Sequence, residues 1–289
     1  MKIQLECIPC TLNTYLRLAK TGMIPEEQRE AIMRQMLRIF STEDFSQSPP
    51  MLGARMHAMI RDAIHHPDPY HRIKAKYNRL MMDQYERFDK LVKNSEDPFN
   101  MAMRLAIAGN VIDFGSQLQP EVMETINRVM DAKLAIDHSS QLRTDLEQAD
   151  SLLYIGDNCG EIVLDKLFLL TLDVPVKYFA VRDSPIINDV TYEDAVLTGM
   201  DKVAQVITTG DNAPGAVWAS TSEQFQRVFR EADVIISKGQ GNLEGLLDVA
   251  HDSIYFLLVT KCDLMAERVG TRKEEFIVKK GKTIFQSVN

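Results

Sequence analysis

The first third of the chain carries apolar residues at helical spacing. Between Glu26 and Phe40 they recur three or four positions apart, and the same spacing returns between Tyr70 and Val92. This spacing places apolar side chains on one face of a helix. Prolines near residues 49–50 and 67–69 interrupt the pattern. We therefore predict that the N-terminal part is all-helical.

A further helix is predicted to begin at Asp97-Pro98 and to contain the run FNMAMRLAIAGN. Aspartate is a favoured N-cap, and proline is tolerated in the first helical turn. We expect an N-terminal helical domain over residues 1–95 and an α/β domain over residues 96–289. The segment 119–150 is predicted to be helical and is assigned to the second domain.

From Ser151 onwards, short β-rich runs alternate with helical segments. The runs are SLLYI, VKYFAV, VAQVIT, DVIIS and SIYFLLV. Each is apolar throughout, which is typical of parallel strands covered on both faces. Helical patterns follow over residues 161–172, 189–198, 222–231 and 243–250. The sequence thus predicts an α/β fold, a Rossmann-like parallel sheet flanked by helices. The run EEFIVKKGKTIF near the C-terminus predicts a hairpin that turns at Gly281.

Composition narrows the functional classes. The 289 residues carry a formal net charge of -8, which gives no electrostatic reason to bind nucleic acid or an anionic membrane. No apolar run approaches the roughly 20 residues of a membrane helix, and the N-terminus does not resemble a signal peptide. Four cysteines are too few for a disulfide scaffold. We expect a cytoplasmic protein without nucleic-acid or membrane partners; the sequence does not indicate its oligomeric state.

Polar segments follow every predicted strand. They are GDNCGE, VRDSPIINDVTYED, TTGDNAPG, SKGQGN and TKCD. Ligands bind at the carboxyl ends of the strands in open parallel sheets, so these segments predict a site at that edge.

Acids and an amide crowd the first two of these segments. They are Asp157, Asn158, Asp183, Asp189 and Asp194. Carboxylates at one strand edge repel each other unless a cation is present, and such an oxygen-rich set suits magnesium or manganese. Alternatively, Asp and Asn only cap the following helices. We favour that alternative for Asp183, which starts a turn, and for Asp194, which lies inside a helical pattern.

Lys238 directly follows the run DVIIS and precedes Gly239 and Gly241. A lysine beside backbone N–H groups at a helix start is well placed to bind phosphate. Neither the dinucleotide-binding nor the phosphate-loop glycine pattern is present. A solvated lysine at a turn is the alternative. Asn110 and Asp113, at the end of the run AIAGNVIDFG, either close the site or serve as caps.

The pair Cys7 and Cys10 is half of a zinc ligand set. Cys159 and Cys262 follow different strands, so no second C-x-x-C completes it. We predict that these cysteines are buried free thiols.

The motifs GDNCGEIVLDKL, SPIINDVTYEDA, SKGQGNLEGL and DPFNMAMRLAIAGNVIDFG together resemble the damage-control metal phosphatase family, once known only as a domain of unknown function. The resemblance covers nearly the whole chain. The N-terminal C-x-x-C is similar to that of the shorter microbial branch. The resemblance implies a helical domain attached to a Rossmann-like domain. It also implies phosphatase activity that depends on a divalent metal ion (Mg, Mn, Co or Ni) and acts on small phosphorylated metabolites.

The resemblance also implies roles for single residues. It places the metal ligands at Asp157, Asn158 and Asp189, and the phosphate-contacting lysine at Lys238. The substrate is expected to contact Asn110, Asp113, Glu161, Arg182, Lys238 and Asn242.

The hypothesis from the sequence is hydrolysis of phosphomonoesters, with a metal-activated water and a lysine that offsets the phosphoryl charge. Asp113, Asp183 and Glu161 are alternative general acids or bases, and a covalent aspartyl intermediate stays open. The alternative functions are a carboxyl methyltransferase that uses S-adenosylmethionine and a non-catalytic protein that binds metal or sugar phosphate.

Overall fold

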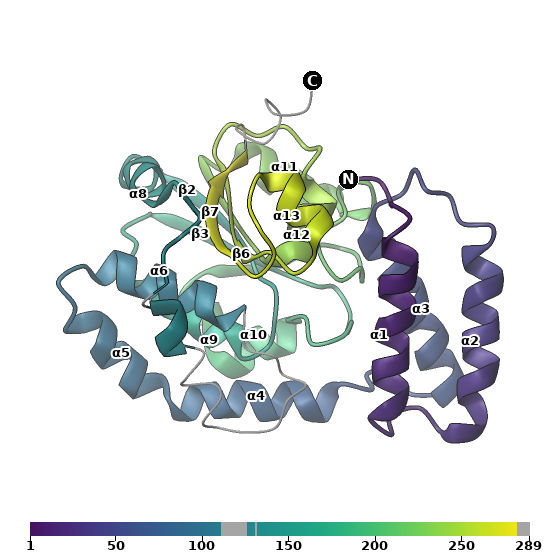
Figure 1. Ribbon diagram of the computed structural model, residues 1–289. Coiled ribbons are helices and arrows are strands. Elements are labelled where there is room, and N and C mark those ends of the chain that lie inside the picture. Colours follow the sequence, from purple (N-terminus) through teal and green to yellow (C-terminus); the bar gives the residue numbers. More distant parts are fainter. Residues whose placement is uncertain (111–125, 131, 282–289) are drawn as a thin grey trace.

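The structure is a computed structural model that describes residues 1–110, 126–130 and 132–281 (Figure 1). Asp113 lies outside these ranges. The helices are α1 (Cys7–Lys20), α2 (Glu26–Phe40), α3 (Pro49–Ile64), α4 (His71–Asp83), α5 (Tyr85–Lys93), α6 (Pro98–Gly109), α8 (Ser139–Glu147), α9 (Glu161–Leu170), α10 (Tyr192–Thr198), α11 (Glu223–Glu231), α12 (Gly239–Leu246) and α13 (Asp263–Val269). The strands are β1 (Ile136–Asp137), β2 (Ser151–Ile155), β3 (Val176–Val181), β4 (Gln205–Thr208), β5 (Val234–Lys238), β6 (Ile254–Val259) and β7 (Phe276–Lys280).

The strands form one seven-stranded sheet in the order β1-β7-β6-β5-β2-β3-β4. All five predicted strands are present, which confirms the α/β fold. The five predicted strands pair in parallel, as expected, whereas β7 runs antiparallel to β6. After α13 the chain returns beside the end of β6, where the Glu274 N–H donates to the Thr260 carbonyl at 2.7 Å. The second half of the hairpin predicted at Gly281 lies outside the described residues.

Both faces of the sheet are covered, and the side chains of β2 show how. Leu152 and Tyr154 belong to the core under α4, α5, α6 and α9, whereas Leu153 and Ile155 belong to the core under α11, α12 and α13. Alternate residues of a strand point to opposite faces. A strand between two cores is therefore apolar at every position, as the sequence shows.

The helices largely follow the predicted pattern. The pattern from Glu26 to Phe40 forms α2, and Asp97 caps α6. The helix predicted over residues 243–250 begins earlier, at Gly239, and in its first turn the Asn242 side chain donates to the Lys238 carbonyl at 2.6 Å. No helix among the described residues has the length and apolar character needed to cross a membrane.

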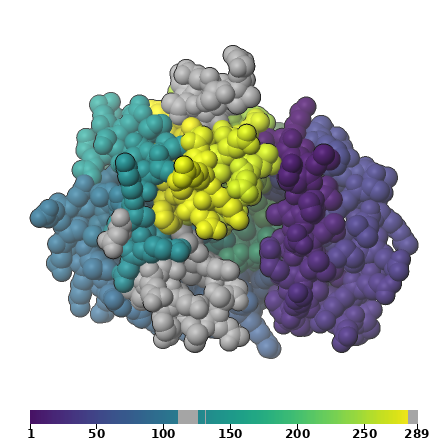
Figure 2. Space-filling model, viewed as in Figure 1, coloured from purple at the N-terminus to yellow at the C-terminus, as the bar shows by residue number. Residues whose placement is uncertain are grey.

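The three N-terminal helices have a core of their own, built from residues between Ile3 and Ile60. In contrast, Tyr77 and Met81 of α4 and Phe88 of α5 belong to the core on the sheet. The boundary at residue 95 stays a prediction, but these cores group α4 and α5 with the sheet. In Figure 2 the surface of the N-terminal helices, in purple, lies next to that of the C-terminal residues, in yellow.

Asp97→Ala tests the start of α6, the helix that leads to Asn110. The Asp97 carboxylate accepts the Asn100 N–H at 3.1 Å and also pairs with Arg143, so the substitution should lower the free energy of unfolding by about 1–2 kcal/mol. Urea denaturation measures this loss. Asp89→Ala, which removes only an exposed ion pair with Lys93, is the control and should cost no more than about 0.5 kcal/mol. Equal losses in the two variants would contradict the capping role.

Candidate active site

The carboxyl ends of β2 and β5 define the centre of the site. β2 lies between β3 and β5, so the chain leaves β2 toward one side of the sheet while β5 belongs to the other side. Such a switch point opens a crevice above the strand ends. The segment Gly156–Gly160 follows β2, and Gly239 follows β5. The predicted motifs GDNCGE and SKGQGN therefore meet across this crevice.

A cleft of about 500 Å³ lies above these strand ends. Its other wall comes from α1 and α3 of the N-terminal helices. The described residues that line it are Met1, Glu6, Cys7, Cys10, Thr11, Thr14, Pro49, Pro50, Gly53, Met56, Asp157, Asn158, Ile187, Asn188, Asp189, Pro214, Gln240, Gly241, Glu244, Lys261, Cys262, Asp263 and Leu264. Three predicted metal ligands are thus in one cleft.

Asp157 is buried at the base of this cleft, and two amides hold its carboxylate. The Asn110 Nδ2 donates to Asp157 Oδ2 at 2.7 Å, and the Asn158 Nδ2 donates to the same oxygen at 2.8 Å. Burial and the nearby Glu161 carboxylate raise the pKa of Asp157, while Lys261 and Arg182 oppose the rise. The negative charge is therefore costly here without a cation.

Asp189 lies beside this pair. The Asn158 and Asp189 backbones form an isolated β-bridge, and the Arg182 Nε donates to Asp189 Oδ2 at 3.0 Å. Burial raises the pKa of Asp189 to about 7; Arg182 opposes this rise and Asp157 adds to it. Ile187, just before, has φ 43°, which is unfavourable for a β-branched residue. Such strain is typical of backbone that is held in place for function.

The donor set fits a hard divalent cation. Asp157, Asn158 and Asp189 offer carboxylate and amide oxygens on one wall of the cleft, as Mg²⁺ and Mn²⁺ prefer. The described residues contain no group of three His, Cys, Asp or Glu side chains arranged for a metal; this set has two carboxylates and one amide. Burial raises the pKa of both Asp157 and Asp189, so a bound cation would stabilise their charged forms.

Lys238 is the last residue of β5, the fourth predicted strand, and its side chain is fully buried. Its ammonium donates to Glu161 at 2.6 Å, to Asp165 at 2.7 Å and to the Ala106 carbonyl at 2.8 Å. An ammonium has three protons, and protein acceptors take all three. Contact between Lys238 and phosphate stays a prediction, and this arrangement does not favour it.

Arg182 and Asn242 lie beneath the cleft, and both are fully buried. The Arg182 Nη2 donates to the Asn242 Oδ1 at 2.7 Å and to the Gly156 carbonyl at 3.1 Å. The Asn242 Nδ2 also donates to the Gly156 carbonyl, at 3.1 Å. These contacts tie the loop after β2 to α12. Substrate contact by Arg182, Asn242 and the buried Glu161 stays a prediction.

The two acids expected to be caps lie apart from the metal set. Asp194 forms a capping box with Thr191 and pairs with Lys74 at 3.0 Å, which confirms the cap interpretation. Asp183 is exposed and accepts a hydrogen bond from Thr208 at 3.0 Å. As a general acid or base, Asp183 is thus a weaker candidate than the sequence indicated.

The cysteine prediction is wrong in part. Cys10 is exposed and Cys7 is half-buried, and both line the cleft together with Cys262. All four thiols are free, and Cys159 is buried, as expected. Burial raises the pKa of the Cys7 thiol. The sequence did not reveal that the N-terminal pair faces the end of β6.

Lys261 is the cation that the sequence analysis did not single out. It is exposed, and among the described residues it is the one lysine or arginine whose side chain lines the cleft. Its charge opposes the rise in the pKa of Asp157. Its position in TKCD, directly after the fifth predicted strand, is the sequence feature that could have indicated its place in the site.

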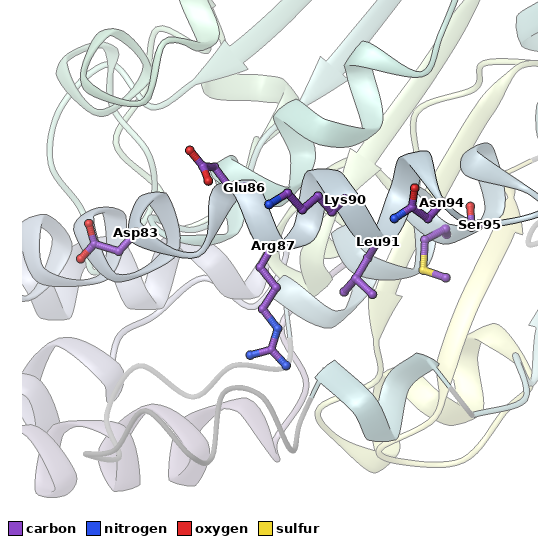
Figure 3. Close-up of a pocket in the computed structure, with 8 residues that line it drawn as sticks. Asp83, Glu86, Arg87, Lys90, Leu91, Asn94 and Ser95 are labelled. Atoms are coloured by element: carbon purple, nitrogen blue, oxygen red, sulfur yellow. The ribbon is translucent and has the colours of Figure 1, made fainter.

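A larger depression of about 680 Å³ lies along α5. Its lining residues are Asp83, Glu86, Arg87, Lys90, Leu91, Asn94, Ser95 and Met101. Figure 3 shows Glu86 and Arg87 leaving the helix in opposite directions, so their charges do not converge. This surface contains no predicted site residue.

Comparison with known proteins identifies the family to which this chain belongs. The model of the damage-control phosphatase ARMT1-like domain matches residues 3–277. The damage-control phosphatase PH1575 of Pyrococcus horikoshii is 31% identical over 98% of this chain and 99% of its own length. A damage-control phosphatase of Archaeoglobus fulgidus is 29% identical over 96% of this chain and 99% of its own length.

Among solved structures, this chain is similar to a crystal structure of the DUF89 family protein PH1575 from Pyrococcus horikoshii. The TM-score is 0.88 at 30% sequence identity, over 97% of this chain and 99% of the other.

Gly239→Ala tests the close approach between the two strand ends. Gly239 has φ 78°, and a Cβ there would lie 1.9 Å from Asp157 Oδ2. The substitution should displace Asp157 and weaken Mn²⁺ binding by at least about 10-fold, as measured by calorimetric titration. Gly22→Ala is the control, since Gly22 has φ 80° with nothing within 4 Å. Both variants should lose about 1–2 kcal/mol of stability. Unchanged Mn²⁺ binding in Gly239→Ala would contradict the placement of Asp157.

Proposed function

We propose that this chain is a divalent-metal-dependent hydrolase that acts on phosphomonoesters of small metabolites. The premise is its family: the chain belongs to the damage-control phosphatase ARMT1-like family. One observation carries the metal dependence: Asp157, Asn158 and Asp189 lie together on one wall of the cleft. They come from loops after two different strands, so the fold gathers an oxygen-donor set at its switch point.

The chain's own residues prepare this donor set. Asp157, Asn158 and Asp189 would hold the ion. Arg182 fixes one oxygen of Asp189, and Asn110 fixes one oxygen of Asp157. A divalent ion bound there would supply charge to polarise a phosphoryl oxygen and would lower the pKa of a bound water.

Lys261 is our candidate for the phosphate-binding cation. Its side chain is exposed in the cleft, whereas the ammonium of Lys238 is buried and fully bonded. A flexible ammonium at the cleft wall can offset the charge of a phosphoryl group in the ground state and as it transfers.

The cleft suits a small substrate with one phosphate. A volume of about 500 Å³ is within the range of small-molecule sites. Pro49, Pro50 and Met56 make part of the wall apolar, while Glu6 and Asp263 disfavour further negative charge on the substrate. Sugar monophosphates and related phosphometabolites fit these features. A cytoplasmic location and the absence of nucleic-acid or membrane partners stay predictions.

Phosphate release from p-nitrophenyl phosphate and a panel of sugar monophosphates tests the function. We expect turnover with Mg²⁺, Mn²⁺, Co²⁺ or Ni²⁺ that a chelator abolishes. Asp157→Ala should lose metal and activity together while staying folded, because Asp157 lies at the cleft and not in an apolar core. No phosphate release with any metal, or release that survives removal of all metal, would contradict the proposal. Consumption of S-adenosylmethionine with a carboxylate acceptor would favour the methyltransferase instead.

Lys261→Ala tests the phosphate-binding role. We expect kcat/KM to fall by roughly 10- to 100-fold at saturating metal, because one electrostatic donor is removed. Lys261→Arg should restore part of the loss, and metal affinity should not fall. Lys273→Ala, which removes another exposed lysine, is the control and should leave kcat/KM unchanged. Equal kcat/KM in Lys261→Ala and the parent would place the phosphate elsewhere.

A further inference from the structure

Lys238 is the centre of a buried ionic cluster beneath the candidate site. Lys238, Glu161 and Asp165 are all fully buried. The ammonium lies 2.6 Å from Glu161 Oε1 and 2.7 Å from Asp165 Oδ1. The Tyr154 hydroxyl donates to the same Asp165 oxygen at 2.6 Å. The cluster joins β5 to α9, and the bond to Ala106 joins both to α6.

The second carboxylate oxygen of Glu161 faces the metal set. Glu161 Oε2 accepts the Asn158 Nδ2 at 2.8 Å and the Asn110 Nδ2 at 3.2 Å. The Asn158 Nδ2 also donates to Asp157 Oδ2, so two carboxylates bind this amide nitrogen. In a planar amide the oxygen lies away from the bound nitrogen. Because Asn158 lines the cleft, its Oδ1 can serve as a ligand there.

We propose that Lys238 is a positioning residue: together with Asp165 it fixes Glu161, and Glu161 fixes the side-chain amide of Asn158 with its oxygen toward the metal site. This inference rests on the metal site of the proposed function. In this inference Lys238 does not contact phosphate but acts on Asn158 through Glu161.

The energetics of burial support this path. A carboxylate with no exposed surface needs a partner of opposite charge, and the loss of one partner leaves the other buried and uncompensated. Lys238 is the one cation that bonds Glu161 among the described residues. Without it, Glu161 has reason to turn away from its present position, and Asn158 then loses a fixed acceptor.

Direct contact with phosphate would require the ammonium to leave these acceptors. Lys238 bonds two carboxylates and a carbonyl in a site with no exposed surface. An incoming phosphate dianion would have to compete with both acids at that depth. The cleft already presents Lys261 at its wall.

Mn²⁺ affinity of Lys238→Met, measured by calorimetric titration without substrate, is the test. Methionine keeps a similar length and removes the charge. We expect Mn²⁺ binding to weaken by roughly 10- to 100-fold, the range for residues that orient metal ligands. At saturating Mn²⁺, the KM for p-nitrophenyl phosphate should stay close to that of the parent.

Lys280→Met is a matched control. Lys280 pairs with Asp145, the Tyr255 hydroxyl donates to Asp145, and the ammonium lies 5.1 Å from the Tyr255 ring centroid. The trio of lysine, aspartate and tyrosine thus resembles that around Lys238, where the Tyr154 ring centroid is 5.9 Å away. Lys280→Met should leave Mn²⁺ affinity unchanged.

Glu161→Gln keeps the inference testable if Lys238→Met does not fold. This isosteric change should weaken Mn²⁺ binding by a similar factor. The double variant Lys238→Met/Glu161→Gln should lose little more than either single variant, because the two residues act as a unit. Parent-like Mn²⁺ affinity in Lys238→Met or in Glu161→Gln would overturn the inference. Unchanged Mn²⁺ affinity in Lys238→Met with a raised KM would show direct phosphate contact instead.

Direct measurement of metal binding separates this inference from the proposed function. If the parent binds Mn²⁺ and the variants show the expected losses, the positioning role holds even if no phosphomonoester is hydrolysed. A parent that binds no Mn²⁺ would overturn the positioning role together with the metal site.

Discussion

The close approach of Asp157 to the Gly239 backbone is the constraint on which the rest of the site depends. A side chain at Gly239 would occupy the position of the Asp157 carboxylate. This contact lets the loop after β2 and the first turn of α12 meet above neighbouring strands. Beneath it, Lys238 reaches α9 and Arg182 reaches Asn242, so each buried cation joins two elements. The geometry of the cleft floor follows from this packing at the switch point.

Electrostatic balance divides the site into two layers. In the buried layer, Lys238 compensates Glu161 and Asp165, which have no contact with solvent. In the cleft layer, Asp157 has only partial compensation, from charges that include Lys261. Buried charges are costly unless paired, so the lower layer is fixed by its pairs. The upper layer keeps the charge imbalance that a cationic ligand can relieve.

The sequence predicted the strands well because a strand between two cores is apolar throughout, and this is a local signal. It also predicted that polar residues of the first two loops would meet, because parallel strands end at one edge, and the family resemblance singled out Asp157, Asn158 and Asp189 among them. It could not reveal that Lys238 points into the molecule, since its partner Glu161 is 77 residues away. Gly239 and Gly241 were predicted to precede a helix that starts at residue 243, but they belong to its first turn. The antiparallel course of β7 likewise depends on how α13 returns the chain.

The two walls of the cleft belong to different hydrophobic cores. The wall that we propose to bind metal rests on the sheet. Cys10, Thr14 and Met56 belong instead to α1 and α3, which together with α2 bury their own apolar residues. Substitutions inside that helical core can therefore reshape the wall around the body of a substrate without disturbing the packing beneath Asp157. The architecture separates substrate choice from reaction chemistry, which gives evolution a way to change the first while retaining the second.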